Sequence, residues 1–91
     1  MSIDDWRSKI DRIDNQLLIL LNIRASCSVQ IGKIKQKQSI PVHSFERENE
    51  ILERLTANNP GPLEKDSIKR LFKYIIEETR NLENISTQEK V

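Results

Sequence analysis

Charged or polar side chains interrupt apolar helical stripes at three places in this sequence, and these are the first candidates for chemistry. Arg24 falls within a series of apolar residues spaced by seven, and Glu48 shares a helical face with apolar neighbours. Thr79 and Glu83 continue a third apolar stripe at four-residue steps. Because an unpaired charge is costly to bury, each position predicts either a protein partner or a bound ligand.

The protein-partner interpretation is that Arg24 and Glu48 pair with each other, or that they fix the register of a helical seam. The ligand interpretation rests on further cations nearby. Lys35 follows Arg24 by three helical turns and lies on nearly the same face. Arg47 directly precedes Glu48. Several cations beside one or two acids suit a small dianion that carries a hydroxyl group.

Arg7 is a further cation, but it lies about 25 Å from Arg24 if both residues belong to one continuous helix. The two side chains then cannot surround one small ligand within a subunit. In an antiparallel dimer, Arg7 of a second subunit would lie beside Arg24. The spacing therefore favours two sites per dimer, each built from both chains.

Composition excludes several other kinds of site. The chain has 15 Lys and Arg against 14 Asp and Glu, so its formal charge of +1 gives no general attraction to nucleic acid or to an anionic membrane. No metal-ligand cluster, phosphate-binding loop, dinucleotide fingerprint or Ser/His/Asp set is present, and we expect neither a metal nor a cofactor. His43 is predicted to be a surface residue, and the single Cys27 a buried apolar one.

The elements that position these residues are predicted to be helices. Apolar residues at steps of seven, without a proline, predict one long helix from about residue 3 to 37, with its N-cap at Ser2 or Asp4. Pro41 ends this pattern. Ser44 is the expected N-cap of a second helix over about 44–58, and a third helix is expected over about 64–85. The tail 86–91 is polar and expected to be frayed.

The first helix decides the expected architecture, which is all-α and homodimeric. At 1.5 Å per residue it spans roughly 50 Å, whereas a compact globule of this length is roughly 30 Å across. Much of its apolar seam must therefore pack against another chain. No uninterrupted apolar run reaches the length of a membrane span, so we expect no membrane partner and a cytoplasmic location. Gly32, inside the helix, is explained by a close neighbouring element or by simple tolerance.

This ordered set of segments resembles the all-α chorismate mutase family. The matching segments are 7–14 (RSKIDRID), 20–24 (LLNIR), 31–35 (IGKIK), 41–42 (PV), 46–48 (ERE) and 71–79 (LFKYIIEET). The resemblance implies a single domain over residues 1–91 and an intertwined homodimer. It also implies the rearrangement of chorismate to prephenate on the route to Phe and Tyr, without a cofactor. Orientation of the substrate and electrostatic stabilisation would accelerate the reaction.

The resemblance also implies roles for the substrate-binding residues. Arg24, together with Arg7 of the other subunit, would hold the substrate carboxylates, and Arg47 would support a carboxylate. Lys35 would donate to the ether oxygen that gains negative charge. Glu48 would accept a hydrogen bond from the ring hydroxyl.

Three positions depart from the most frequent residue of the family. Thr79 stands where Ser is commoner, and would contact a carboxylate. Ser44 stands where Asp is usual, so its backbone N–H is the group expected to act. Glu83 stands at a position that is Gln in many members, and is expected beside the ether oxygen. There only its protonated form can donate a hydrogen bond.

Two alternatives stay open from the sequence. An isochorismate pyruvate lyase would bind a similar dianion with the same cations. A non-enzymatic helical dimer would satisfy Arg24 and Glu48 with protein partners alone and would have no cavity between its helices. The sequence also leaves open whether the chain docks onto another enzyme of the aromatic pathway.

Overall fold

The computed structural model describes residues 1–88 as three α-helices joined by two short connections. The helices are α1 (Ile3–Gln38), α2 (Phe45–Ala57) and α3 (Lys65–Gln88), and the described residues contain no strand. The all-α, three-helix prediction is confirmed. The third helix was expected to end at about residue 85, and α3 continues to Gln88. Residues 89–91 of the expected frayed tail lie outside the described residues.

Local sequence signals account for both ends of α1. Ser2 is the N-cap: its hydroxyl accepts from the backbone N–H of Asp5, and the Asp5 carboxylate accepts from the backbone N–H of Ser2. These hydrogen bonds favour the charged form and lower the pKa of Asp5 below its usual value. At the other end, Ser39 adopts a left-handed conformation with φ of 56°, and its backbone N–H caps the last turn.

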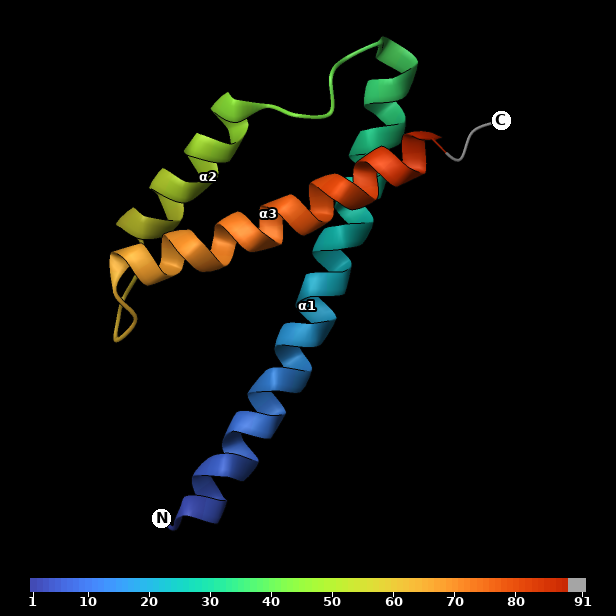
Figure 1. Cartoon of the computed structure of the whole chain (residues 1–91). Helices are drawn as coiled ribbons and strands as arrows, with labels where there is room; N and C mark the ends of the chain where they lie inside the picture. Colours follow the sequence, from blue (N-terminus) through green and yellow to red (C-terminus); the bar gives the residue numbers. More distant parts are fainter. Residues whose placement is uncertain (89–91) are drawn as a thin grey trace.

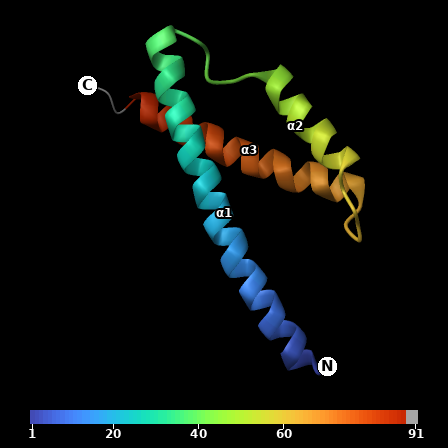
Figure 2. The same ribbon diagram turned by 180° about the vertical axis from the view of Figure 1, so that it is seen from behind.

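Helix α3 packs against both other helices and is therefore the element that joins the fold (Figure 1). It crosses the C-terminal half of α1, and α2 lies along its N-terminal part. Seen from either side, the N-terminal half of α1 extends away from α2 and α3 (Figure 2). The described fold is accordingly elongated, with principal extents of 54 × 27 × 14 Å and a radius of gyration of 16.3 Å. A compact chain of this length has a radius of gyration of about 12 Å.

The packed part of the chain is small, and a glycine permits its closest approach. Ile51 of α2 and Ile76 of α3 are the buried hydrophobic residues among those described. Gly32 of α1 is buried against α3: a Cβ atom there would lie 3.2 Å from the Cβ and 3.3 Å from the Cα of Glu83. The close-neighbour explanation of Gly32 is thus confirmed, because any side chain would push α3 outward.

Most of the apolar side of α1 is uncovered in the single chain. Leu17 and Leu20 are 51% and 61% exposed, and Ile10 is 54% exposed. One 18-residue window of α1 has a mean hydropathy of 1.4, which by length and composition alone suffices for a membrane span. This corrects the expectation drawn from uninterrupted apolar runs. An apolar surface of this size is typical of a helix that packs against a partner.

Candidate functional site

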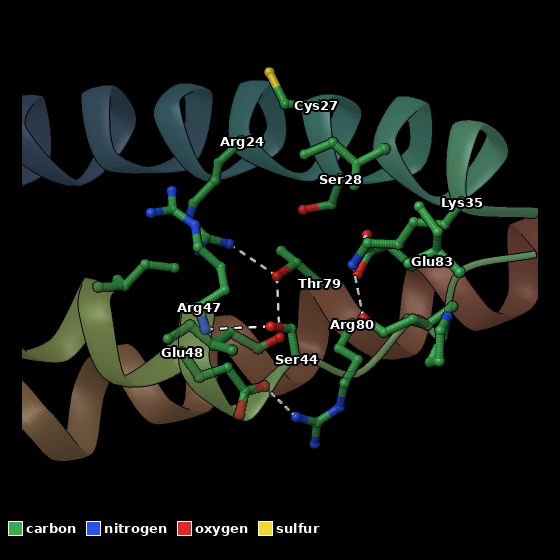
Figure 3. A pocket seen from close by; sticks show the side chains of 16 residues that line it. Arg24, Cys27, Ser28, Lys35, Ser44, Arg47, Glu48, Thr79, Arg80 and Glu83 are labelled. Atoms are coloured by element: carbon green, nitrogen blue, oxygen red, sulfur yellow. Dashed lines mark hydrogen bonds and ion pairs between the residues drawn. The ribbon is translucent and has the colours of Figure 1, made fainter. Parts of the chain in front are cut away.

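A pocket of about 500 Å³ lies where α1, α3 and the start of α2 converge (Figure 3). Its volume is in the range of small-molecule sites. Seven of the eight sequence-predicted substrate-binding residues line it, contributed by all three helices and by the N-cap of α2: Arg24, Lys35, Ser44, Arg47, Glu48, Thr79 and Glu83. Residues widely separated in the sequence are thereby brought to one cavity.

Arg7 is the predicted residue that this chain does not bring to the pocket. It lies near the N-terminus of α1, where its side chain is 72% exposed and within 3.8 Å of the Asp4 carboxylate. An exposed pair of this kind contributes little to stability. Within one chain, the pocket therefore forms without Arg7.

Arg24 reaches from α1 to α3. Its Nη1 donates to the hydroxyl of Thr79 over 2.8 Å, and that hydroxyl lies 3.0 Å from the carbonyl oxygen of Ile75 one turn earlier. The interpretation that Arg24 and Glu48 pair with each other is wrong. Among the described residues, Arg24 has no ion pair with a carboxylate. Its guanidinium is oriented by a neutral partner and keeps its charge available for a ligand.

Lys35 is anchored by two different elements. Its ammonium donates to the backbone carbonyl of Val42 over 2.8 Å, which ties the connection between α1 and α2 to the site. It also lies 3.9 Å from Oε1 of Glu83. These contacts place the Lys35 charge at the pocket wall with its side chain 20% exposed, where low solvent access strengthens its interactions.

Glu83 is the buried acid of the site, with only 8% of its surface exposed. Burial raises the pKa of its carboxyl above the usual 4.5, because the charged form loses solvent. Lys35, Arg24 and Arg80 oppose this rise through their positive charges without cancelling it. The direction of this pKa shift, which the sequence left undetermined, is therefore upward.

Glu48 is paired with residues that the sequence analysis did not assign to the site. Arg80 of α3 forms an ion pair through Nη1 with Oε1 of Glu48, and Nε2 of His43 lies 3.0 Å from Oε2. Arg80 also lines the pocket. The available signal was its spacing, because Arg80 lies three residues before Glu83 and residues three apart share a helical face. His43 is exposed, as predicted, but it is not isolated.

The remaining predicted residues lie at the start of α2. Ser44 caps this helix, and its hydroxyl accepts from the backbone N–H of Arg47 over 3.2 Å. The hydroxyl is thus engaged in helix capping, which agrees with a substrate role for the backbone rather than for the side chain. Arg47 is exposed and lies 3.4 Å from Glu50. Cys27 lines the pocket and is exposed, so the prediction of a buried Cys27 is wrong for the single chain.

The arrangement has the electrostatics of an anion-binding site. The pocket contains four cations, Arg24, Lys35, Arg47 and Arg80, against the two carboxyl groups of Glu48 and Glu83. The part of the chain that the structure describes has no group of three His, Cys, Asp or Glu side chains arranged to hold a metal ion. What these residues offer chemically is orientation of an anion and hydrogen bonding to its oxygen atoms.

Comparison with known sequences gives a consistent family. The sequence profile described as chorismate mutase type II matches residues 6–84. The bifunctional chorismate mutase/prephenate dehydratase of Aquifex aeolicus is 36% identical over 85 residues, covering 89% of this chain and 24% of the relative. The corresponding bifunctional enzyme of Escherichia coli K12 is 40% identical over 74 residues, covering 80% of this chain and 19% of the relative. The chain thus spans about a quarter or less of the length of these curated relatives.

Solved structures agree with the sequence matches. A chorismate mutase from Thermus thermophilus superposes with a TM-score of 0.89 at 35% identity, covering 90% of this chain and 93% of that one. A chorismate mutase from Helicobacter pylori in complex with prephenate gives a TM-score of 0.90 at 27% identity, covering 98% and 97%. With a matching profile over most of its length and two helical structures of the same shape, this chain belongs to the chorismate mutase type II family.

Proposed function

We propose that this chain catalyses the rearrangement of chorismate to prephenate, the activity named for its relatives. The observation that carries the proposal is the pocket itself, in which cations and acids from three helices face one small cavity. Chorismate is a dianion with a ring hydroxyl, and the cavity offers groups that match both features. The reaction is intramolecular, so the residues need only orient the substrate and stabilise developing charge.

Arg24 is the proposed carboxylate clamp on the α1 side. The hydrogen bond from its Nη1 to Thr79 fixes one edge of the guanidinium and leaves its other N–H groups for the substrate. Arg47 supports a carboxylate from the α2 side of the pocket. Thr79 then acts mainly through Arg24, because its own hydroxyl is already committed to that side chain and to its helix.

Lys35 is the proposed donor to the ether oxygen. As the ether C–O bond breaks, negative charge develops on this oxygen, and a fixed cation stabilises the transition state more than the ground state. Its contacts with the Val42 carbonyl and Glu83 hold the ammonium in place before the substrate binds. This preorganisation reduces the reorganisation needed during the reaction.

Glu83 is the proposed second donor to the ether oxygen, in its protonated form. An ionised carboxylate would repel the developing negative charge, whereas the neutral acid donates a hydrogen bond. Burial of Glu83 raises its pKa, which enlarges the pH range in which the neutral form is populated. The positive charges of the nearby cations lower the pKa of Glu83 and so reduce the upper pH limit of that range.

A symmetric homodimer is the proposed active assembly. The exposed apolar side of α1 requires cover, and a second hollow of about 480 Å³ between α1 and α3, lined by Leu21, Ala25, Tyr74 and Ile75 among others, is likewise largely apolar. Arg24 breaks the apolar window of α1, and it points into the pocket (Figure 3). A second protein chain fits these features better than a lipid bilayer, and it would supply Arg7 to the pocket.

The non-enzymatic alternative required that no cavity exist between the helices, and a cavity is present. The lyase alternative is decided by the substrate test. Purified protein is incubated separately with chorismate and with isochorismate, and the products are identified by chromatography. Conversion of chorismate to prephenate supports the proposal. Release of pyruvate from isochorismate without mutase activity would instead assign the lyase reaction, and turnover of neither substrate would remove the enzymatic assignment.

A further inference from the structure

Arg80 is a charged residue of the pocket to which the proposed function assigns no role. It lies on α3, one residue after Thr79, and reaches across to the carboxylate of Glu48 on α2. Both side chains are mostly buried, with 25% and 22% of their surfaces exposed. In Figure 3 the Glu48 carboxylate turns toward Arg80 and away from the guanidinium of Arg24. The ion pair therefore fixes the direction in which this acid points.

That direction matters because Glu48 lines the same cavity as the cations proposed to bind the substrate. These cations are Arg24, which has no carboxylate partner within the described residues, and Arg47, whose partner Glu50 forms an exposed pair at 3.4 Å. A carboxylate released from Arg80 would find these guanidinium groups as its next partners. It would then occupy the charges that a substrate carboxylate needs, since each pairing neutralises one cation of the clamp.

We propose that Arg80 is a positioning residue that holds Glu48 away from the carboxylate-binding cations and so keeps them free for the substrate. This inference rests on the proposed function for its link to catalysis. The structural part of the inference concerns the position of the Glu48 side chain when Arg80 is absent. This part can be tested without any substrate. Arg80 thus acts through Glu48 and does not need to touch the reacting atoms.

His43 restrains Glu48 less than Arg80 does while both residues are present. Its Nε2 lies 3.0 Å from Oε2 of Glu48 and 3.0 Å from Nη1 of Arg80. One ring nitrogen cannot donate to the carboxylate and accept from the guanidinium at the same time. His43 is also more exposed than Arg80. The ion pair with Arg80 is therefore the main restraint, and His43→Ala should alter substrate affinity much less than loss of Arg80.

The substrate test uses Arg80→Met, which keeps the aliphatic stem and removes the charge. We expect KM for chorismate to rise by about tenfold or more, with kcat changed much less, because the ground-state clamp is blocked. Arg80→Lys should restore most of the affinity. Arg70→Ala is the matched control, since Arg70 lies on the same helix, is exposed and contacts Ser67. It should leave both constants unchanged.

A double variant separates this mechanism from a simple loss of net charge. In Arg80→Met, adding Glu48→Gln removes the competing carboxylate and should lower KM again. In the parent protein, Glu48→Gln should not tighten binding, because Arg80 already holds Glu48 away from the clamp. A net-charge effect would tighten binding in both backgrounds, and that result would overturn the proposal.

The decisive measurement is a crystal structure of the Arg80→Met protein without ligand. We expect a Glu48 carboxylate oxygen within hydrogen-bond distance of Arg24 or Arg47. A Glu48 side chain that stays in its original position would overturn the proposal, whether or not the protein proves to be a mutase. Conversely, absence of mutase activity in the parent protein with a relocated Glu48 would reject the proposed function and support the role of Arg80.

Discussion

The two halves of α1 have the same heptad pattern but opposite surroundings. In the C-terminal half, Gly32 is buried against α3, and Arg24 and Lys35 make hydrogen bonds or ion pairs with other elements. In the N-terminal half, Ile10 and Arg7 are exposed, and no other element of the described chain covers them. The pattern predicts that both halves pack, and only one does so within a single chain.

The difference supports the proposed homodimer, in which a second chain completes each site. The C-terminal half of α1 carries a preorganised pocket whose side chains are fixed before substrate binds. Its N-terminal half carries an exposed apolar surface, and Arg7, which lies outside the pocket. Both become useful if a second chain adds its own N-terminal half to the first chain's pocket. The predictions below test this division from the largest expected effect to the smallest.

Lys35→Ala should produce the largest loss, because it removes the fixed cation from the packed half. Stabilisation of an oxyanion by one donor typically contributes about 10² to 10³ in kcat. We expect a fall of that order in kcat with a smaller change in KM, measured by continuous chorismate depletion. Lys33→Ala on the exposed face of the same turn is the control and should be neutral. A normal kcat for Lys35→Ala would remove this side chain from the mechanism.

Mixing two inactive variants tests whether the two halves act across subunits. Arg7→Ala damages the exposed half and Arg24→Ala the packed half, so each homodimer lacks one residue at both sites. Random exchange gives about half heterodimers with one intact site each, and about a quarter of the parent activity should return. Subunit exchange is verified by mass spectrometry of intact dimers. Verified exchange without recovery would mean that each site is built within one chain.

Gly32→Ala tests the close packing of α1 against α3. The new Cβ would lie 3.2 Å from the Cβ of Glu83, so α3 must move outward. Alanine gains about 1 kcal/mol in helix propensity, whereas overpacking costs about 1–3 kcal/mol. We expect a small net loss of stability in urea denaturation and a roughly tenfold loss of kcat/KM, because Glu83 and Lys35 are displaced. Unchanged kinetics would show that the site tolerates a wider helix separation.

Glu83→Gln should have the smallest effect at low pH and a growing one as pH rises. Burial raises the folded-state pKa of Glu83, and the proposed active form is the protonated one, so kcat/KM of the parent should fall as pH rises through that pKa. Gln is neutral at every pH and keeps a donor, so the variant should be flatter between pH 5 and 8. A flat parent profile, or a variant inactive throughout, would contradict this role.

The same pKa shift has a consequence for stability. A carboxyl group whose pKa is higher in the folded state stabilises the fold below its unfolded pKa, and this contribution is lost as pH rises through the folded pKa. The free energy of unfolding of Glu83→Gln, relative to that of the parent, should therefore be higher at neutral pH than at pH 4. Urea denaturation of both proteins at the two pH values measures this difference. The effect is confined to this pH interval.

Much of the local structure follows from the sequence itself. The heptad series gives the long helix, Pro41 ends it, and Ser2 and Ser44 cap the helices as expected. The residues that interrupt the apolar stripes, Arg24, Glu48, Thr79 and Glu83, all line the pocket. These signals are local because hydrophobic periodicity and capping depend on residues within a few turns of each other.

Only the tertiary structure decided which charges meet. The sequence suggested that Arg24 pairs with Glu48. In the structure, α3 crosses α1 so that Arg24 donates a hydrogen bond to Thr79, and α2 packs along α3 so that Glu48 forms an ion pair with Arg80. The rise in the pKa of Glu83 likewise depends on burial against Gly32. Pairing and burial are set by the angle and separation of helices distant in sequence, and no periodicity within one helix encodes them.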